Sequence, residues 1–336
     1  MIRRRSLIGM AASIPLLMAA SQAMAQTKEL TIAFPSPGGL GYFGLYNAIG
    51  EGYFAKENIT IQPQSVNGSG QVIQALLAGQ AQLGHPGPGP LLNARKNGGD
   101  IVYIYNYFAR SQFNLVVPEG SSFKSPTDLK GKVIGVGTSD GAEVAFVRSI
   151  FDAAGMKEGA DYTFLTVGEG GMAVAGFMQK SIDAYASDTA GVATLNLRGV
   201  KLRTLTPPEF QSYFGNGYAV TRQYLEANKD VLAGFGRALV KGIKFGMDPA
   251  NRAKTLEHAK MGNPQQLEDM KFADALLDVY FNLTAPLDPS KGFGYNNPAA
   301  WERWQTTLVK SGDLPTPLPD LTKAYTNEFI QTWNGQ

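Results

Sequence analysis

Between residues 30 and 208, hydrophobic residues recur in two alternating patterns. Short β-rich runs such as residues 30–34 (LTIAF) and 132–137 (KVIGVG) predict strands. They alternate with segments such as residues 72–78, whose apolar positions fall on one face of a helix. From residue 223 onward helical patterns dominate, with prolines at positions typical of helix starts. The alternation predicts an α/β fold with parallel sheets that helices cover on both faces.

The cycle of strands and helices runs twice, which predicts two lobes, each with a central sheet and flanking helices, and a helical C-terminal tail. Residues 113–118 (FNLVVP) and 217–221 (GYAVT) flank the second cycle, so we expect them to be the strands that link the lobes. The expected division is residues 26–117 for the first part of lobe 1, 118–216 for lobe 2, and 217–336 for the return to lobe 1 and the C-terminal helices. Because open α/β sheets bind ligands beyond the carboxyl ends of their strands, we expect a ligand between the lobes.

The first 25 residues have the pattern of a secretory signal peptide. Three arginines at positions 3–5 precede the apolar stretch LIGMAASIPLLMAA, and residues 23–25 (AMA) form a small-residue cleavage site. Residues 4–8 (RRSLI) also fit a loose twin-arginine pattern, so both export routes stay open. We therefore predict an exported protein of the periplasm, with no membrane insertion after residues 1–25 are removed.

Composition excludes several classes of function. Removal of arginines 3–5, the only charged residues of the signal peptide, would take the formal net charge from +2 to −1. That balance gives no electrostatic case for nucleic acid or an anionic membrane. The chain has no cysteine and only two histidines, His85 and His258, which excludes thiol chemistry and a zinc site of cysteines and histidines. We expect no cofactor, no metal ion and no enzymatic activity.

Five expected strand-to-helix turns are rich in glycine and small polar residues. They are residues 35–42 (PSPGGLGY), 67–70 (NGSG), 85–90 (HPGPGP), 137–142 (GTSDGA) and 168–172 (GEGGM). Glycine lets a ligand approach the backbone, and the helix that follows presents free N–H groups. The prolines of HPGPGP stiffen that turn, which predicts a rigid wall of the ligand cleft. Each turn taken alone is more simply a helix cap, but five together favour a binding cleft.

One of these turns matches the nucleophile motif of serine hydrolases. Residues 137–141 have the pattern G-x-S-x-G between an expected strand and an expected helix, with Ser139 in the nucleophile position. In that fold the histidine follows the serine, which leaves only His258, in the polar helical tail. A serine hydrolase is therefore the less favoured alternative to a binding protein.

The order of motifs resembles the periplasmic nitrate/sulfonate/taurine-type substrate-binding proteins of ABC importers, a family that also includes thiamine-pyrimidine-synthase-like proteins. The resemblance spans about residues 29–250, and Asn58 stands where the family pattern usually has glycine. The motifs that carry it are GLYNAIGEGYFAKENITIQ (44–62), IQALLAGQAQLGHPGPGPLLNA (73–94), SPTDLKGKVIGVGTSDG (125–141), IDAYASDTAGVATLNLRG (182–199) and YAVTRQYLEANKDVLAGFGRALVKGIKF (218–245).

The resemblance implies a two-lobe, type II periplasmic-binding fold that closes on a small ligand and delivers it to a membrane permease with an ATPase. The protein would act as a monomer. A periplasmic module that senses a ligand and regulates a membrane partner needs the same closure and stays an alternative. The ligand contacts implied by the family motifs are Ser36, Gly38, Gly39, Tyr42, Asn67, Ser69, His85, Gly87, Pro88, Thr138, Ser139, Asp140 and Glu169, with Asp188 and Asn216 as further candidates.

The charge of the ligand stays open at this point. None of the five turns contains arginine or lysine, whereas Asp140 and Glu169 are acidic. Helix N-termini can hold a sulfonate, nitrate or taurine-like anion without a basic side chain, but the acids favour a neutral or amine-bearing ligand such as an aminopyrimidine at least as much. Arg110 and Arg148 lie outside the turns, and the sequence leaves open whether either reaches the cleft. Asp188 can equally bond a ligand amine or cap the next helix, and Tyr42 can stack on a ligand or fill the core.

Overall fold

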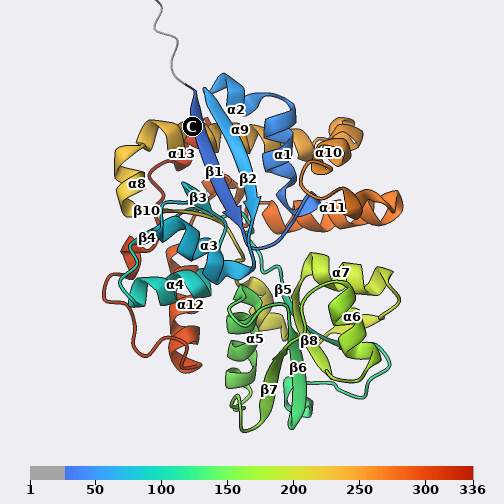
Figure 1. Cartoon of the computed structure of the whole chain (residues 1–336). Coiled ribbons are helices and arrows are strands. Elements are labelled where there is room, and N and C mark those ends of the chain that lie inside the picture. Colours follow the sequence, from blue (N-terminus) through green and yellow to red (C-terminus); the bar gives the residue numbers. More distant parts are fainter. Residues whose placement is uncertain (1–26, 336) are drawn as a thin grey trace, which may run out of the picture.

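The computed structural model describes residues 27–335, which form two α/β lobes, each around a five-stranded sheet (Figure 1). The signal peptide predicted for residues 1–25 lies outside this range. The sheet of lobe 1 has the order β2-β1-β3-β10-β4, with β1 at Lys28–Phe34, β2 at Ile59–Ser65, β3 at Leu83–Gly84, β4 at Ile101–Tyr105 and β10 at Tyr218–Thr221. The sheet of lobe 2 has the order β7-β6-β8-β5-β9, with β5 at Phe113–Pro118, β6 at Lys132–Val136, β7 at Tyr162–Thr166, β8 at Ala184–Asp188 and β9 at Leu202–Thr204.

Both sheets are mixed, whereas the sequence pattern predicts parallel ones. In lobe 1, β1 pairs in parallel with β2 and β3, but β10 is antiparallel to β3 and β4. In lobe 2, β6 pairs in parallel with β7 and β8, but β5 is antiparallel to β8 and β9. The antiparallel strand is in each case the first one after the chain crosses between lobes. It enters its sheet from the cleft side, opposite to the strands of the βα repeats.

Helices cover the sheets as expected. Those of lobe 2 are α5 (Ala142–Ala153), α6 (Gly171–Met178) and α7 (Thr189–Leu197). Those of lobe 1 and the C-terminal tail are α1 (Phe43–Gly50), α2 (Tyr53–Lys56), α3 (Gly68–Leu77), α4 (Pro88–Lys96), α8 (Arg222–Ala227), α9 (Lys229–Met247), α10 (Arg252–Ala259), α11 (Met270–Thr284), α12 (Pro298–Lys310) and α13 (Ile330–Asn334). Among the described residues, no helix is both long and apolar enough to cross a membrane.

The two crossing segments, residues 106–112 and 205–217, lie against each other. Phe108 and Gly215–Asn216 exchange backbone hydrogen bonds: the N–H of Phe108 donates to the carbonyl of Asn216 (3.0 Å), and the N–H of Gly215 donates to the carbonyl of Phe108 (2.9 Å). The strands at 113–118 and 217–221, predicted to link the lobes, are the first strands after each crossing. The boundary expected between residues 117 and 118 falls inside β5, all of whose pairings lie in the second sheet.

The C-terminal tail contacts both lobes, because α12 packs against α4 of lobe 1 and α5 of lobe 2. We call this three-helix contact the hinge-side joint. Trp301 and Trp304 of α12 belong to one hydrophobic cluster with side chains of both lobes, and Trp304 Nε1 donates to the carbonyl of Phe214 (3.2 Å). Arg148 of α5 pairs with Asp313, which follows α12. These contacts join the lobes on the side away from any open cleft.

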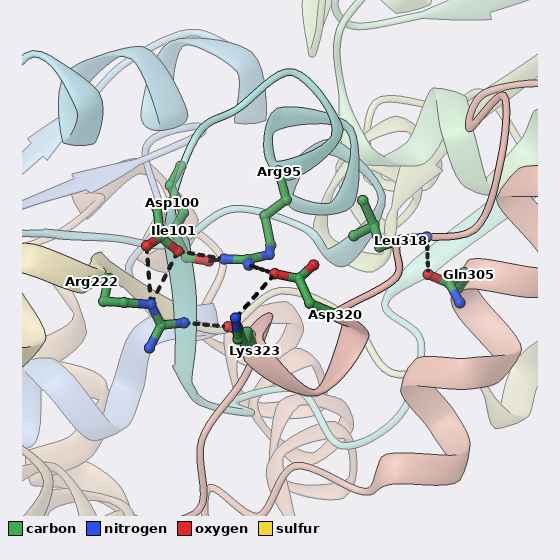
Figure 2. Close-up of polar contacts among 8 residues, drawn as sticks. All are labelled: Arg95, Asp100, Ile101, Arg222, Gln305, Leu318, Asp320 and Lys323. Carbon is green, nitrogen blue, oxygen red and sulfur yellow. Dashed lines mark hydrogen bonds and ion pairs between the residues drawn. The ribbon is translucent and has the colours of Figure 1, made fainter.

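A polar network fastens the end of the tail to lobe 1 (Figure 2). The guanidinium of Arg95 on α4 is almost completely buried and pairs with Asp100 (2.8 Å) and Asp320 (3.4 Å). Arg222 also pairs with Asp100 (3.0 Å) and donates to the carbonyl of Lys323 (2.7 Å). The tail is thus held to lobe 1 by this polar network as well as by the packing of α12 on α4.

Candidate ligand cleft

A cavity of about 750 Å³ lies between the lobes, where the sequence predicts the ligand. Its walls come from the loops after β1, β2, β6, β7 and β8 and from both crossing segments. The loop and first turn of α11 add residues from the C-terminal tail. These strands end at the cavity, and each therefore contributes to its wall the loop or the helix start that follows it.

Eight of the predicted contact residues line this cavity. From lobe 1 they come from the loop after β1 and the start of α3, and from lobe 2 they come from the ends of β6, β7 and β8 and the second crossing segment. The eight are Ser36, Gly38, Tyr42, Ser69, Thr138, Glu169, Asp188 and Asn216. The seven others do not line it: Gly39, Asn67, His85, Gly87, Pro88, Ser139 and Asp140.

The stiff HPGPGP turn serves the contact between the lobes. A Cβ atom on Gly87 would lie 2.3 Å from the Cβ of Ala142, and one on Gly89 would lie 3.1 Å from the Cβ of Ala145. Both alanines belong to α5 of lobe 2. The glycines therefore allow the start of α4 to touch α5, and the prediction that this turn forms an open wall of the cleft is not what the structure shows.

His85, the first residue of that turn, is fully buried. Its ring lies 4.8–5.9 Å from the ring centroids of five aromatic residues, and neither ring nitrogen has a hydrogen-bond partner among the described residues. Burial lowers the pKa of His85 to about 3, so the ring is neutral. Tyr42 packs edge-on to His85 at 5.0 Å and separates it from the cavity, which Tyr42 lines.

The residues of the hydrolase motif do not assemble a catalytic triad. Ser139 is exposed and does not line the cavity. His258 lies in α10 of lobe 1, where its Nδ1 is 3.0 Å from Asn47 Oδ1 and its Nε2 is 3.6 Å from a carboxylate oxygen of Glu51. Neither histidine has Ser139 as a hydrogen-bond partner in the described part of the chain.

The other open questions of the sequence have structural answers. Arg110 donates to the carbonyls of Asn282 (2.6 Å) and Ala285 (2.8 Å), and Arg148 pairs with Glu158 and Asp313. Neither arginine lines the cavity. Asp188 caps α7, since its carboxylate accepts a hydrogen bond from the N–H of Gly191 at 2.7 Å, and it also lines the cavity.

The cavity contains acids that sequence reasoning missed. Glu143 lies in the first turn of α5, one residue beyond the glycine-rich turn, and Glu268 and Asp269 come from the tail, which was not expected to reach the cleft. Glu143 could have been predicted to line the cleft, because it directly follows the GTSDGA turn. No comparable signal exists for Glu268 and Asp269, because their approach depends on the path of the tail.

We call Glu143, Glu169 and Asp188 the carboxyl trio. Burial raises the pKa of Glu143 to about 8, helped by the charges of Glu169, Asp188 and Asp140. Withdrawal from bulk water raises the pKa of Glu169 to about 7, helped by Asp188, although Glu169 stays accessible from the cavity. Burial also raises the pKa of Asp188, against the hydrogen bonds from Gly191 and Ala190. The trio therefore binds protons more tightly than free carboxyl groups do.

The two lobes, the crossing segments and the cleft define a type II periplasmic-binding fold. A family model described as NMT1/THI5 like matches residues 41–253, more than half of the chain, and the chain belongs to that family. This confirms the family group that the sequence motifs predict.

Known relatives agree with that assignment. The riboflavin-binding protein RibY of Chloroflexus aurantiacus is 24% identical over 328 residues, which cover 95% of this chain and 91% of the relative. An aliphatic sulfonates-binding protein of Escherichia coli is 28% identical over 173 residues, about half of each chain. The solved alkanesulfonate-binding protein SsuA of Xanthomonas axonopodis pv. citri, bound to MOPS, matches with a TM-score of 0.69 and 19% identity over 90% of this chain and 99% of that one.

Proposed function

We propose that the protein is the solute-binding component of an ABC-type importer and that it captures a small solute in the cleft between its lobes. The observation that carries this proposal is the cavity of about 750 Å³, to which both lobes and both crossing segments contribute. A ligand in that position contacts both lobes at once, so it favours the closed arrangement through its differential affinity for it. Family membership supports the same function, and the relatives cited above are named as binding proteins.

The proposal includes a location and partners. An exported, monomeric protein of the periplasm would hand its ligand to a membrane permease that works with an ATPase. The lining residues predicted from the sequence, among them Tyr42, Ser69, Thr138 and Asn216, would contact the ligand. Solute binding without catalysis fits the cleft, since Ser139 lies outside it and no histidine contacts Ser139.

Thermal melting of the purified protein against a broad panel of small metabolites tests this function. A ligand present at 100 times its dissociation constant stabilises the folded state by about 2.7 kcal/mol, which moves the melting midpoint by about 2–4 °C for a chain of this size. We expect at least one metabolite to give such a shift, and we expect Ala190→Trp, which fills the cleft from α7, to abolish it. Ala160→Trp, on an exposed turn of the same lobe, is the matched control and should leave the shift unchanged. A panel without any stabilising compound, or a shift that survives Ala190→Trp, would contradict the proposal.

A further inference from the structure

The charged residues around the cavity are strongly unbalanced. Five acidic residues line it, and Arg198 is the one basic residue that does so among residues 27–335. Arg198 is exposed at the end of α7, where its guanidinium lies over Gly170 and Gly171. The five acids are Glu143, Glu169, Asp188, Glu268 and Asp269.

The carboxyl trio has no internal counter-charge. No lysine or arginine of the described chain lies within 4.0 Å of a carboxylate oxygen of Glu143, Glu169 or Asp188. The hydrogen bonds that Asp188 accepts as a helix cap occupy only part of its acceptor capacity. Glu143 and Asp188 are half-buried and Glu169 is exposed at the cavity, so all three can meet a cation that enters it.

The geometry of lobe 2 makes the trio converge. Glu143 follows β6, Glu169 follows β7, and Asp188 ends β8, and these three strands are neighbours in the sheet order β7-β6-β8. The side chain of Glu143 folds back over Gly141, and that of Glu169 lies over Gly137. Burial is the main cause of the raised pKa values of Glu143 and Glu169, and the charge of Asp188 adds to both, so these charges lie within reach of one another.

Lobe 1 offers aromatic faces to the same space. Tyr42 and Tyr280 line the cavity, and the charge of Asp188 contributes to the raised pKa of both hydroxyls, so both rings lie near that carboxylate. Phe272, in the first turn of α11, also lines the cavity. Aromatic faces beside carboxylates attract organic cations through their quadrupoles as well as through charge.

Two hydrogen-bonding residues of the wall add polarity without adding positive charge. Thr138 and Asn216 line the cavity and are 8% and 2% exposed, and Thr138 Oγ1 and Asn216 Oδ1 have no hydrogen-bond partner within the described chain. The amide nitrogen of Asn216 is already used, since it donates to the carbonyl of His85 at 3.2 Å.

We infer that the cleft binds an organic cation, namely an amine, amidine or guanidine group on a ring or short chain, held by the carboxyl trio and covered by Tyr42 and Tyr280. The inference rests on the proposed function, because it names the chemical class of the solute for that same cleft. A sulfonate or nitrate in this position would meet five acids with Arg198 alone, exposed at the end of α7, to offset them. A cation would instead offset the negative charge of these acids.

The test is a melting screen of the purified protein with three sets of probes of matched size at pH 8.5. The cationic set contains benzylamine, benzamidine, putrescine and agmatine. The neutral set contains benzyl alcohol, benzamide and 1,4-butanediol, and the anionic set contains benzoate, benzenesulfonate and butane-1-sulfonate. We expect stabilising compounds to come from the cationic set, and isothermal titration of the best of them should show tighter binding at pH 8.5 than at pH 5.5, by about 10-fold or more.

Conservative variants locate the cation. Glu169→Gln and Asp188→Asn keep the size of each side chain, and asparagine can still cap α7. Each should weaken binding of the cation by about 10-fold without lowering the melting midpoint of the ligand-free protein at pH 8.5. Glu119→Gln, at an exposed position of the same lobe outside the cavity, is the matched control and should leave the affinity within about 2-fold.

The outcomes separate this inference from the function on which it rests. Binding of a neutral or anionic probe that Ala190→Trp abolishes would overturn the cation inference and keep the solute-binding function. Cation binding that Glu169→Gln and Asp188→Asn leave intact would overturn it as well, because the cation would then sit elsewhere. Failure of all three sets and of the broad metabolite panel would overturn both.

Discussion

The two lobes meet in two regions of opposite character. At the hinge-side joint, glycines and alanines bring α4 and α5 into direct contact, and α12 covers them with Trp304. In the cleft, the same pair of lobes is separated by a cavity of about 750 Å³ whose lobe 2 wall is acidic. Glycine-rich turns that look alike in the sequence therefore have two tasks. The glycines of the turn before α4 permit close packing on α5, whereas residues of the turns after β1, β6 and β7 line the cavity.

This difference has a consequence for lobe movement. A joint that is closely packed on one side of the crossing segments allows the lobes to rotate only about that side. Trp304, Tyr213 and Phe146 pack together there, with Trp304 and Tyr213 at 5.0 Å between ring centroids. We therefore expect ligand-driven closure to be small, because α7 and α11 are also in contact.

The largest expected effect is on the joint itself, in Trp304→Ala. Trp304 is 1% exposed, and loss of a buried tryptophan costs about 3–5 kcal/mol of the free energy of unfolding. Because Trp304 holds α12 to both lobes, we also expect the ligand-free variant to have a larger radius of gyration. Denaturant unfolding and small-angle scattering measure the two effects.

Trp333→Ala is the control for that experiment. Trp333 is equally buried, but it packs within lobe 1, where its Nε1 donates to the carbonyl of Leu232. It should lose similar stability without any change in the radius of gyration. If the two variants had the same radius of gyration, α12 would not be what restrains the lobes.

The second prediction concerns the close approach of α4 and α5. Gly87 has an ordinary backbone conformation, so alanine is disfavoured there by the contacts of its Cβ, at 2.3 Å from the Cβ of Ala142 and 3.0 Å from Asn216 Oδ1. We expect Gly87→Ala to reduce the free energy of unfolding by about 1–3 kcal/mol, because the added methyl group overpacks the joint. Gly120→Ala, where nothing lies within 4 Å of the added Cβ, should change it by less than about 1 kcal/mol. Equal stabilities of the two variants in urea would show that the lobes can separate at this point without cost.

The sequence predicts the cleft between the lobes, but it does not predict the hinge-side joint. The alternation of strands and helices, the two lobes and the cleft between them follow from local patterns, since each βα unit shows its own period. The packing of HPGPGP against α5 could not be predicted. Whether its glycines contact a ligand or a helix depends on how the two lobes are placed relative to each other. His85 was misjudged for the same reason: its position after β3 points to the cleft, and Tyr42, distant in sequence, covers it.

The acidic half of the site was predicted only where an acid lay inside a recognisable turn. Glu169 and Asp188 follow strands directly and were named, whereas Glu143 lies one residue inside α5 and was not. Asp140, which was named, points away from the cavity: a Cβ atom on Gly70 of α3 would lie 1.9 Å from its carboxylate. Whether an acid near a helix start lines the cavity depends on the direction of its side chain. Spacing along the sequence does not determine that direction.

The third prediction concerns the acids of the cleft and the pH dependence of stability. The folded-state pKa values of Glu143 and Glu169, about 8 and about 7, lie above the ordinary value of 4.5. Between pH 4.5 and 8 the folded protein therefore binds more protons than the unfolded chain, so the free energy of unfolding falls as the pH rises through this window. We expect the melting midpoint of the ligand-free protein to fall from pH 5 to pH 8.5.

Glu143→Gln and Glu169→Gln should flatten that dependence, and the double variant should flatten it most. Glu119→Gln, at an exposed site outside the cavity, should follow the unsubstituted protein. A midpoint that rises across the same window in all five proteins would mean that the trio is already ionised in the folded state at pH 5.

The smallest expected effect is in the polar network that holds the tail to lobe 1. Asp320 is 39% exposed, and its carboxylate meets Arg95 at 3.4 Å and Lys323 at 4.0 Å. Arg95 keeps its bonds to Asp100 and to the carbonyl of Ile101 without Asp320, so Asp320→Asn should cost no more than about 1 kcal/mol in urea unfolding. Most of that loss should disappear in 1 M salt, because exposed ion pairs are screened. A loss as large as that of Gly87→Ala would show that charges, and not the packing of α12 on α4 and α5, secure the C-terminal tail.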